Sequence, residues 1–162
     1  MPKKDDLISD EELFEIRKKY QSERKKRLRS DGMSQFNYGT GDFSRFIDDP
    51  IKIDTNARQA LNDEVEVVII GGGFGGLLTA ACLYKLGIKD FRIIEEGNDV
   101  GGTWYWNRFP GAQCDIESYI YMPLLEELGY IPSEKYASGY EILNHCQRIA
   151  RAYGVYEKGC FG

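Results

Sequence analysis

The stretch that decides the fold runs from residue 65 to residue 95. It begins with the β-branched run VEVVII (65–70), continues with GGGFGG (71–76) and the apolar run LLTAACLYKL (77–86), and ends with FRIIE (91–95). This pattern predicts a strand buried on both faces, a tight turn, a helix and a second parallel strand. A βαβ unit of this kind holds the diphosphate and ribose of a dinucleotide in many proteins.

The glycines of this stretch have the spacing G-x-G-x-x-G, at Gly71, Gly73 and Gly76. The first permits the tight turn, the second lets the backbone approach a pyrophosphate, and the third lets the helix pack close to the strand. The helix N-terminus adds unpaired N–H groups and a partial positive charge, which favour an anion. Gly87 is expected to end the helix.

The second strand ends on Glu95, about 20 residues after the last glycine. A carboxylate at this place accepts hydrogen bonds from ribose hydroxyls and repels a 2′-phosphate, so the nucleotide bound here is not expected to be NADP. Strand, glycine turn, helix and terminal acid together indicate a bound dinucleotide rather than a glycine turn without a ligand. The motif leaves FAD and NAD both open.

An aromatic block follows, GGTWYWNRFPGAQCD (101–115). Its mixture of tryptophans and polar side chains suits a large planar ring with polar edges. Ordinary loop packing explains the same composition equally well, so residues alone do not decide between the two interpretations.

The block 101–118, GGTWYWNRFPGAQCDIES, with the glycine motif and Glu95, resembles the N-terminal FAD-binding region of the type I Baeyer–Villiger monooxygenases. The similarity extends over residues 65–153. It implies an α/β fold with a Rossmann-like βαβ unit, FAD as bound cofactor and NADPH as electron donor. It also implies an oxidoreductase that uses O2 to convert a small-molecule ketone to an ester or lactone.

The resemblance also assigns roles to individual residues. Gly71, Gly73, Gly75 and Gly76 would hold the FAD diphosphate, and Glu95 its ribose. The flavin side of the cofactor would be lined by Thr103, Trp104, Tyr105, Trp106 and Tyr121. Asp115 would lie near the flavin ring in a supporting catalytic role, and NADP would contact Gln113, Cys114 and Asp115. Many members of the family have arginine at the position of Gln113.

Residues 1–63 are expected to form an N-terminal helical arm and extension, and residues 64–162 a Rossmann-like domain with an incomplete parallel sheet, truncated at its C-terminus. The family's second glycine-rich fold for NADPH and its catalytic arginine are expected beyond Gly162, so this chain alone is expected to be inactive. Two alternatives stay open: another flavoprotein with two dinucleotide domains, and a non-catalytic, truncated nucleotide-binding fragment.

The arm is predicted to begin with a helix over 10–29, capped by Ser9 and Glu12. The second half of this helix is strongly basic, which is compatible with a contact with a polyanion or a membrane. Glu11 and Glu12 at its start and cations toward its end match the helix dipole, so a solvated face is favoured. The polar segment after it is interpreted as an ordered arm with five apolar anchors: Phe36, Tyr38, Phe43, Phe46 and Ile47.

Near the C-terminus, Ser138 and Glu141 are predicted to cap a helix with one apolar face. Cys146 lies on that face and is expected in the core. His145 points about 100° away from it, so a catalytic thiol–imidazole pair is not expected, and His145 is predicted to lie on the surface.

Composition excludes several classes of protein. The chain is 42% hydrophobic and 29% charged, and its net charge of −5 arises in residues 64–162, which argues against a nucleic-acid groove. No apolar run is long enough to cross a membrane and no signal peptide is recognised, so a cytoplasmic protein is expected. Four scattered cysteines and one histidine predict neither a metal site nor disulfides. The sequence does not predict the oligomeric state.

Overall fold

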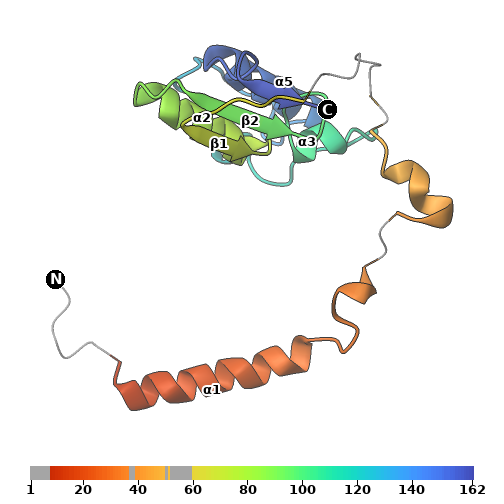
Figure 1. The fold of residues 1–162 in the computed structure, drawn as a ribbon, viewed down its shortest axis with the longest axis vertical. Coiled ribbons are helices and arrows are strands. Elements are labelled where there is room, and N and C mark those ends of the chain that lie inside the picture. Colours follow the sequence, from red (N-terminus) through yellow and green to blue (C-terminus); the bar gives the residue numbers. More distant parts are fainter. Residues whose placement is uncertain (1–7, 37–38, 50, 52–59) are drawn as a thin grey trace. The chain divides into compact units, whose positions relative to one another are not determined.

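The computed structural model describes residues 8–36, 39–49, 51 and 60–162. The chain divides into two compact units, Met1–Ile47 and Asp48–Gly162, and the first contains the long helix drawn in red in Figure 1. The division between residues 47 and 48 lies upstream of the boundary predicted between residues 63 and 64. The predicted anchor Tyr38 and the side chain of Phe46 lie outside the described residues.

The described residues of the first unit form a long helix and two short 3-10 helices. The helix α1 spans Asp10–Arg27, ending slightly before the predicted residue 29, and is followed by η2 (Gly32–Gln35) and η3 (Gly41–Phe46). The predicted capping box is confirmed, because the Ser9 N–H donates to Glu12 Oε2 at 3.0 Å and the Glu12 N–H donates to Ser9 Oγ at 3.2 Å. No residue of α1 is buried. The acidic first turn, the basic last turn and the capping box therefore stabilise this helix more than packing does.

The second unit contains a parallel sheet, which confirms the predicted α/β class. Its strands lie in the order β1-β2-β3, with Val67 opposite Phe91 and Ile93 opposite Gly159. The elements of this unit, in chain order, are β1 (Val67–Ile70), α2 (Phe74–Lys85), β2 (Phe91–Glu95), α3 (Thr103–Trp106), α4 (Ser118–Tyr121), α5 (Gly139–Ala152) and β3 (Gly159–Phe161).

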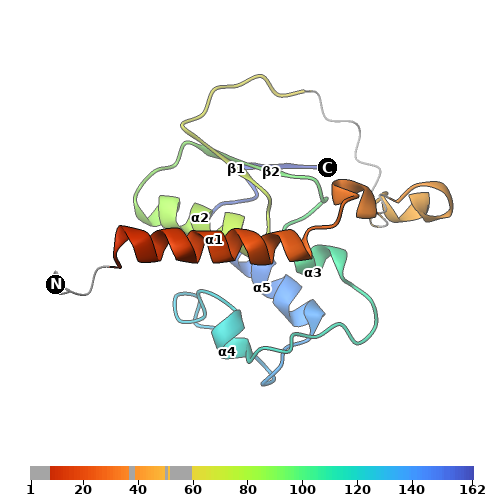
Figure 2. The ribbon, with the colours of Figure 1, turned by 90° about the horizontal axis from the view of Figure 1, so that it is seen from below.

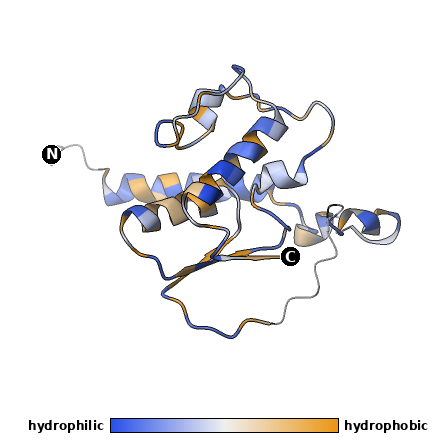
Figure 3. Cartoon of the chain, turned by 90° about the horizontal axis from the view of Figure 1, so that it is seen from above, coloured by the Kyte–Doolittle hydropathy of each residue, from blue (hydrophilic) through white to orange (hydrophobic). Residues whose placement is uncertain are grey.

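Among the described residues of the second unit, helices cover only one face of this sheet, so the expectation that the first strand is buried on both faces is wrong. Figure 2 shows the sheet nearly edge-on, with α2 and α5 on the same side of it. On that side Ile69 and Ile93 are buried. On the other side Val68 is 53% exposed and Ile70 is 85% exposed, because no described element covers them. Figure 3 shows the strands as strongly hydrophobic in spite of this exposure.

The loops after β2 form a second apolar cluster under the short helices α3 and α4. Its buried members are Trp104, Tyr105, Cys114, Met122, Ala137, Ile142 and Leu143. The helix α5 contributes to both clusters, since Cys146 and Ile149 pack with the sheet while Ile142 and Leu143 pack with α3. This confirms the predicted core position of Cys146. Among the described residues, no helix is both long and apolar enough to cross a bilayer, and no cluster of ligands suits a metal ion.

Candidate functional site

The glycine loop joins β1 to α2 and has the geometry predicted for it. Gly71 has φ of +94°, a conformation that favours glycine, and its N–H donates to the carbonyl of Ile94 at 2.7 Å. A Cβ on Gly76 would lie 2.0 Å from the carbonyl oxygen of Gly71. The turn and the close packing of helix on strand thus both depend on glycine.

One side of the glycine loop faces open space. A Cβ on Gly75 would meet no atom within 4 Å, and a Cβ on Gly73 would meet only the backbone of Gly102, at 3.5 Å or more. The N–H groups in the first turn of α2 have no acceptor within the helix, as at every helix N-terminus. The loop therefore presents backbone donors and a partial positive charge to open space, an arrangement that suits a diphosphate.

Glu95 stands beside the glycine loop at the end of β2. Its carboxylate accepts hydrogen bonds from the backbone N–H of Gly72 at 2.5 Å and from that of Gly97 at 2.7 Å. The side chain is only 8% exposed. A carboxylate has about four acceptor sites, so two amide donors leave room for hydroxyl groups of a ribose. The same fixed negative charge would repel a 2′-phosphate.

A second glycine pair interlocks with the first loop. Gly101 and Gly102 have φ of +133° and +51°, and the Gly101 N–H donates to the carbonyl of Gly72 at 3.0 Å. A Cβ on Gly102 would lie 2.8 Å from the Cα of Gly73. These contacts bring the start of α3 next to the start of α2, so the aromatic block begins at the edge of the glycine loop.

Three aromatic side chains connect this block to α2. The indole N–H of Trp104 donates to the hydroxyl of Tyr121 at 3.0 Å, and their ring centroids are 5.8 Å apart. The ring of Tyr121 also meets Phe74 edge to face at 5.6 Å. Trp104 and Tyr121, both predicted to line the flavin side, therefore lie together beside the first residue of α2.

The other predicted flavin-side residues are placed differently. Tyr105 is 1% exposed and packs under Gly97, where an added Cβ would approach its ring within 2.8 Å. Trp106 is 43% exposed and meets Tyr105 edge to face, and Thr103 is exposed. Tyr105 therefore supports the loop that follows Glu95, while Thr103 and Trp106 are open to a ligand.

The predicted NADP-contact residues lie on a separate stretch. Gln113 pairs with Ser138 in an antiparallel bridge and donates its side-chain amide to the carbonyl of Tyr136. Cys114 is buried, and Asp115 is exposed. Both residues line a shallow hollow that also includes Gln113 and Tyr136.

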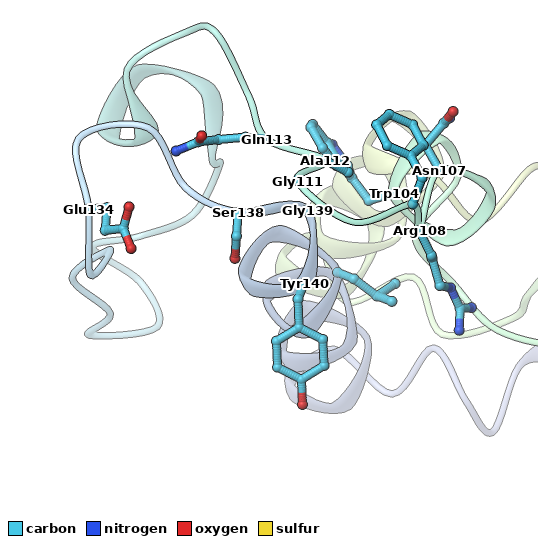
Figure 4. A pocket seen from close by; sticks show the side chains of 12 residues that line it. Trp104, Asn107, Arg108, Gly111, Ala112, Gln113, Glu134, Ser138, Gly139 and Tyr140 are labelled. Atoms are coloured by element: carbon cyan, nitrogen blue, oxygen red, sulfur yellow. The ribbon is translucent and has the colours of Figure 1, made fainter.

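A deeper cavity of about 380 Å³ lies between the segment 107–113 and the start of α5 (Figure 4). Trp104, Arg108, Gln113 and Tyr140 are among the residues around it. No residue of the glycine loop lines this cavity, and neither does Glu95. The open glycine loop and Glu95 therefore form a candidate nucleotide site that is separate from this cavity.

The prediction that His145 lies on the surface is wrong, because its side chain is fully buried. Nδ1 lies 3.2 Å from the Arg148 guanidinium, which can only donate, so Nε2 carries the proton and donates to the Pro123 carbonyl at 2.6 Å. The ring also stacks on Tyr130, at 5.5 Å between centroids. The loop 122–133 folds over this face of α5, which a helical pattern alone does not reveal. The adjacent Cys146 remains a core residue, so no catalytic pair forms.

We expect this histidine to make stability depend on pH. Burial lowers the pKa of His145 from its usual value near 6.5, an effect that the hydrogen bond to Pro123 opposes. The unfolded chain therefore binds a proton more readily, and the free energy of unfolding should fall as pH drops below about 6.5. Denaturant unfolding between pH 7 and about pH 5 measures this dependence. His145→Gln should flatten it, and an unchanged slope in that variant would contradict the assignment.

Sequence reasoning missed the residues that hold Glu95 and its loop. The N–H groups of Gly72 and Gly97 fix the carboxylate, and Asp49 hydrogen-bonds to Tyr105 and Asn98 from far away in the chain. Gly72 and Gly97 belong to glycine-containing stretches that the sequence shows, but their hydrogen bonds to Glu95 do not follow from it. Nothing in the sequence around Asp49, a turn signal before proline, pointed to this loop.

Comparison with known proteins identifies the relatives of this chain. The family described as "NAD(P)-binding Rossmann-like domain" matches residues 69–128. Pentalenolactone D synthase from Streptomyces arenae is 51% identical over 152 residues, which are 93% of this chain and 25% of that protein. Baeyer-Villiger monooxygenase ATR8 from Stachybotrys chlorohalonatus is 49% identical over 148 residues, which are 91% of this chain and 24% of that protein.

Solved structures agree with these relatives. The polycyclic ketone monooxygenase from the thermophilic fungus Thermothelomyces thermophila superposes with a TM-score of 0.73 at 40% identity, over 94% of this chain and 26% of that chain. A structure of OTEMO in complex with FAD and NADP superposes with a TM-score of 0.56 at 36% identity, over 62% of this chain and 20% of that chain. The chain spans about a quarter of the length of the curated relatives that it matches. The resemblance predicted from residues 101–118 is confirmed.

Proposed function

We propose that this chain, a homologue of the Baeyer–Villiger monooxygenases, is the FAD-binding N-terminal portion of a flavoprotein of that type. The observation that carries the proposal is the glycine loop, whose open side adjoins a carboxylate held by two backbone amides. The loop supplies donors for a diphosphate, and Glu95 supplies acceptors for a ribose without a 2′-phosphate. FAD has both groups, and the matched OTEMO structure is a complex with FAD and NADP.

In this proposal, different residues bind different parts of the cofactor. Gly71, Gly73, Gly75 and Gly76 border the diphosphate, with α2 directing its N-terminal amides toward the negative charge. Glu95 orients the ribose. On the flavin side, the indole N–H of Trp104 donates to the hydroxyl of Tyr121 at 3.0 Å. This hydrogen bond fixes the two aromatic side chains relative to each other without a ligand. The exposed Thr103 and Trp106 complete this side.

Beyond the nucleotide site, we assign Asp115 a supporting catalytic role near the flavin ring. It is exposed and follows the buried Cys114, so the backbone that carries it is anchored while its carboxylate is free to approach a ligand. Gln113, Cys114 and Asp115 form the NADP contact in this proposal. The Gln113 amide donates to the Tyr136 carbonyl, so this contact offers its carbonyl oxygen and the backbone rather than a cationic group.

The activity we propose for the whole protein is NADPH- and O2-dependent oxygenation of a small-molecule ketone to an ester or lactone. Bound FAD would supply the redox chemistry, while the protein positions the reactants and excludes water. This chain corresponds to about a quarter of its relatives. We assign it the cofactor-holding part of the reaction and no complete active site.

A domain exchange tests this assignment. We expect the chain alone to show no ketone-dependent NADPH oxidation. A chimera in which this chain replaces the matching quarter of ATR8, to which it is 49% identical, should support ketone-dependent NADPH oxidation. The same chimera with Gly73→Val is the matched control and should lose both FAD and activity. Turnover by the isolated chain would contradict the division of roles. A chimera that holds FAD and NADP but oxygenates no ketone would contradict the monooxygenase assignment.

A further inference from the structure

We propose that Asp49 is a positioning residue for the cofactor site, holding the loop after β2 in the arrangement that orients Glu95 toward the ribose. This inference rests on the proposed function, because it concerns the same nucleotide site. Asp49 lies in the second compact unit, but it comes from the segment that precedes the βαβ unit by many residues. In this proposal Asp49 adds a residue from outside the βαβ unit to the cofactor site.

The carboxylate of Asp49 has three hydrogen-bond donors around it. One oxygen accepts from the hydroxyl of Tyr105 and from the side-chain amide of Asn98, the latter at 2.9 Å. The other oxygen accepts from the backbone N–H of Ile51 at 2.9 Å. Three donors on one half-buried carboxylate fix its position more firmly than a single exposed ion pair does, since each donor occupies a separate lone pair of the carboxylate.

A short relay connects this contact to Glu95. The hydroxyl of Tyr105 also accepts from the backbone N–H of Asn98 at 3.0 Å, so Asp49 and Tyr105 together fix that residue from two sides. The preceding residue is Gly97, which packs on the Tyr105 ring and donates its N–H to the Glu95 carboxylate at 2.7 Å. Displacement of the tyrosine hydroxyl would therefore be transmitted to the ribose-binding carboxylate through two consecutive backbone amides.

The protonation states of Asp49 and Tyr105 are those that their hydrogen bond requires. Burial works against ionisation of Asp49, but hydrogen bonds from Tyr105, Ile51 and Asn98 outweigh it and hold the pKa of this carboxyl below its usual value. Burial, together with the hydrogen bond to Asp49, raises the pKa of the Tyr105 phenol. At neutral pH the pair is therefore a carboxylate with a protonated phenol, which is the state that can form the hydrogen bond.

The test compares Asp49→Ala with Asp48→Ala, the same change at the exposed neighbouring residue. Loss of hydrogen bonds to a charged group should weaken FAD binding about tenfold in Asp49→Ala and leave it unchanged in Asp48→Ala. Fluorescence titration with FAD measures both affinities. Tyr105→Phe removes only the hydroxyl, and it should weaken binding similarly. Combining it with Asp49→Ala should add little, because both changes break the same relay.

A second readout separates positioning from a general loss of structure. ADP and 2′-phospho-ADP are used to displace bound FAD, and the preference for ADP reports the placement of the Glu95 carboxylate. This preference should shrink in Asp49→Ala, whereas mere destabilisation would weaken both ligands equally. Equal preference in Asp49→Ala and wild type, or equal FAD affinity in the two alanine variants, would overturn the inference. Absence of FAD binding by the wild type would instead overturn the proposed function.

Discussion

Replacing Gly73 with valine is expected to weaken FAD binding about 100-fold while the fold is retained. Gly73 has φ of −75°, which any residue adopts, and a Cβ there would meet only Gly102, in ordinary van der Waals contact at 3.5 Å. The protein should therefore tolerate the change. The added methyl groups would occupy space on the open side of the glycine loop, where we place the diphosphate, so FAD should bind less tightly. Titration with FAD and far-UV circular dichroism measure the two effects separately.

Thr79→Val is the control for this variant. It places valine at an exposed position of α2, the helix that follows Gly73, where the threonine hydroxyl donates to the Gly75 carbonyl at 2.8 Å. FAD affinity should remain that of the wild type. If Gly73→Val binds FAD as tightly as Thr79→Val does, the diphosphate does not lie at this loop.

Replacing Gly76 with alanine should have the opposite pattern, a loss of folding stability. The new Cβ would lie 2.0 Å from the carbonyl oxygen of Gly71 and 3.4 Å from the side chain of Ile69. Backbone cannot yield as a flexible side chain does, so α2 has to move away from β1. We expect the free energy of unfolding to fall by about 3 kcal/mol, as for severe overpacking of a core. Chemical denaturation without cofactor measures this loss.

Gly75→Ala, one residue earlier in the same helix, is the matched comparison. A Cβ at Gly75 meets nothing within 4 Å, and alanine is a better helix former than glycine by about 1 kcal/mol. This variant should be as stable as the wild type or slightly more stable. Equal stability of the Gly75 and Gly76 variants would mean that the close approach of α2 to β1 does not limit the fold.

The glycine loop was predictable because its requirements are local. Gly71 and Gly76 are separated by one turn of backbone, and the conformations they need follow from the strand and helix on either side. The caps at Ser9 and Ser138 follow equally from a few neighbouring residues, and both are confirmed. At Ser138 the Glu141 side chain does not return to the cap but binds Tyr130 and Ser133. That choice depends on a loop that the helical pattern does not contain.

What could not be predicted depends on parts of the chain far apart in sequence. Val68 and Ile70 have the composition of a buried strand, yet their exposure is decided by which elements cover the sheet. His145 is buried for the converse reason, since a distant loop folds over it. Asp49 reaches Tyr105 across more than fifty residues, so no local pattern contains their contact. Such contacts are set by tertiary packing, for which residue periodicity gives no signal.

We expect this chain to bind FAD through the glycine loop and Glu95. Titration of the purified protein with FAD and, separately, with NADPH tests it most directly. We predict saturable binding of FAD at one equivalent, with quenching of flavin fluorescence, and markedly weaker binding of NADPH, because the fixed carboxylate of Glu95 repels a 2′-phosphate. Tighter binding of NADPH than of FAD, or no binding of FAD by the folded chain, would contradict it.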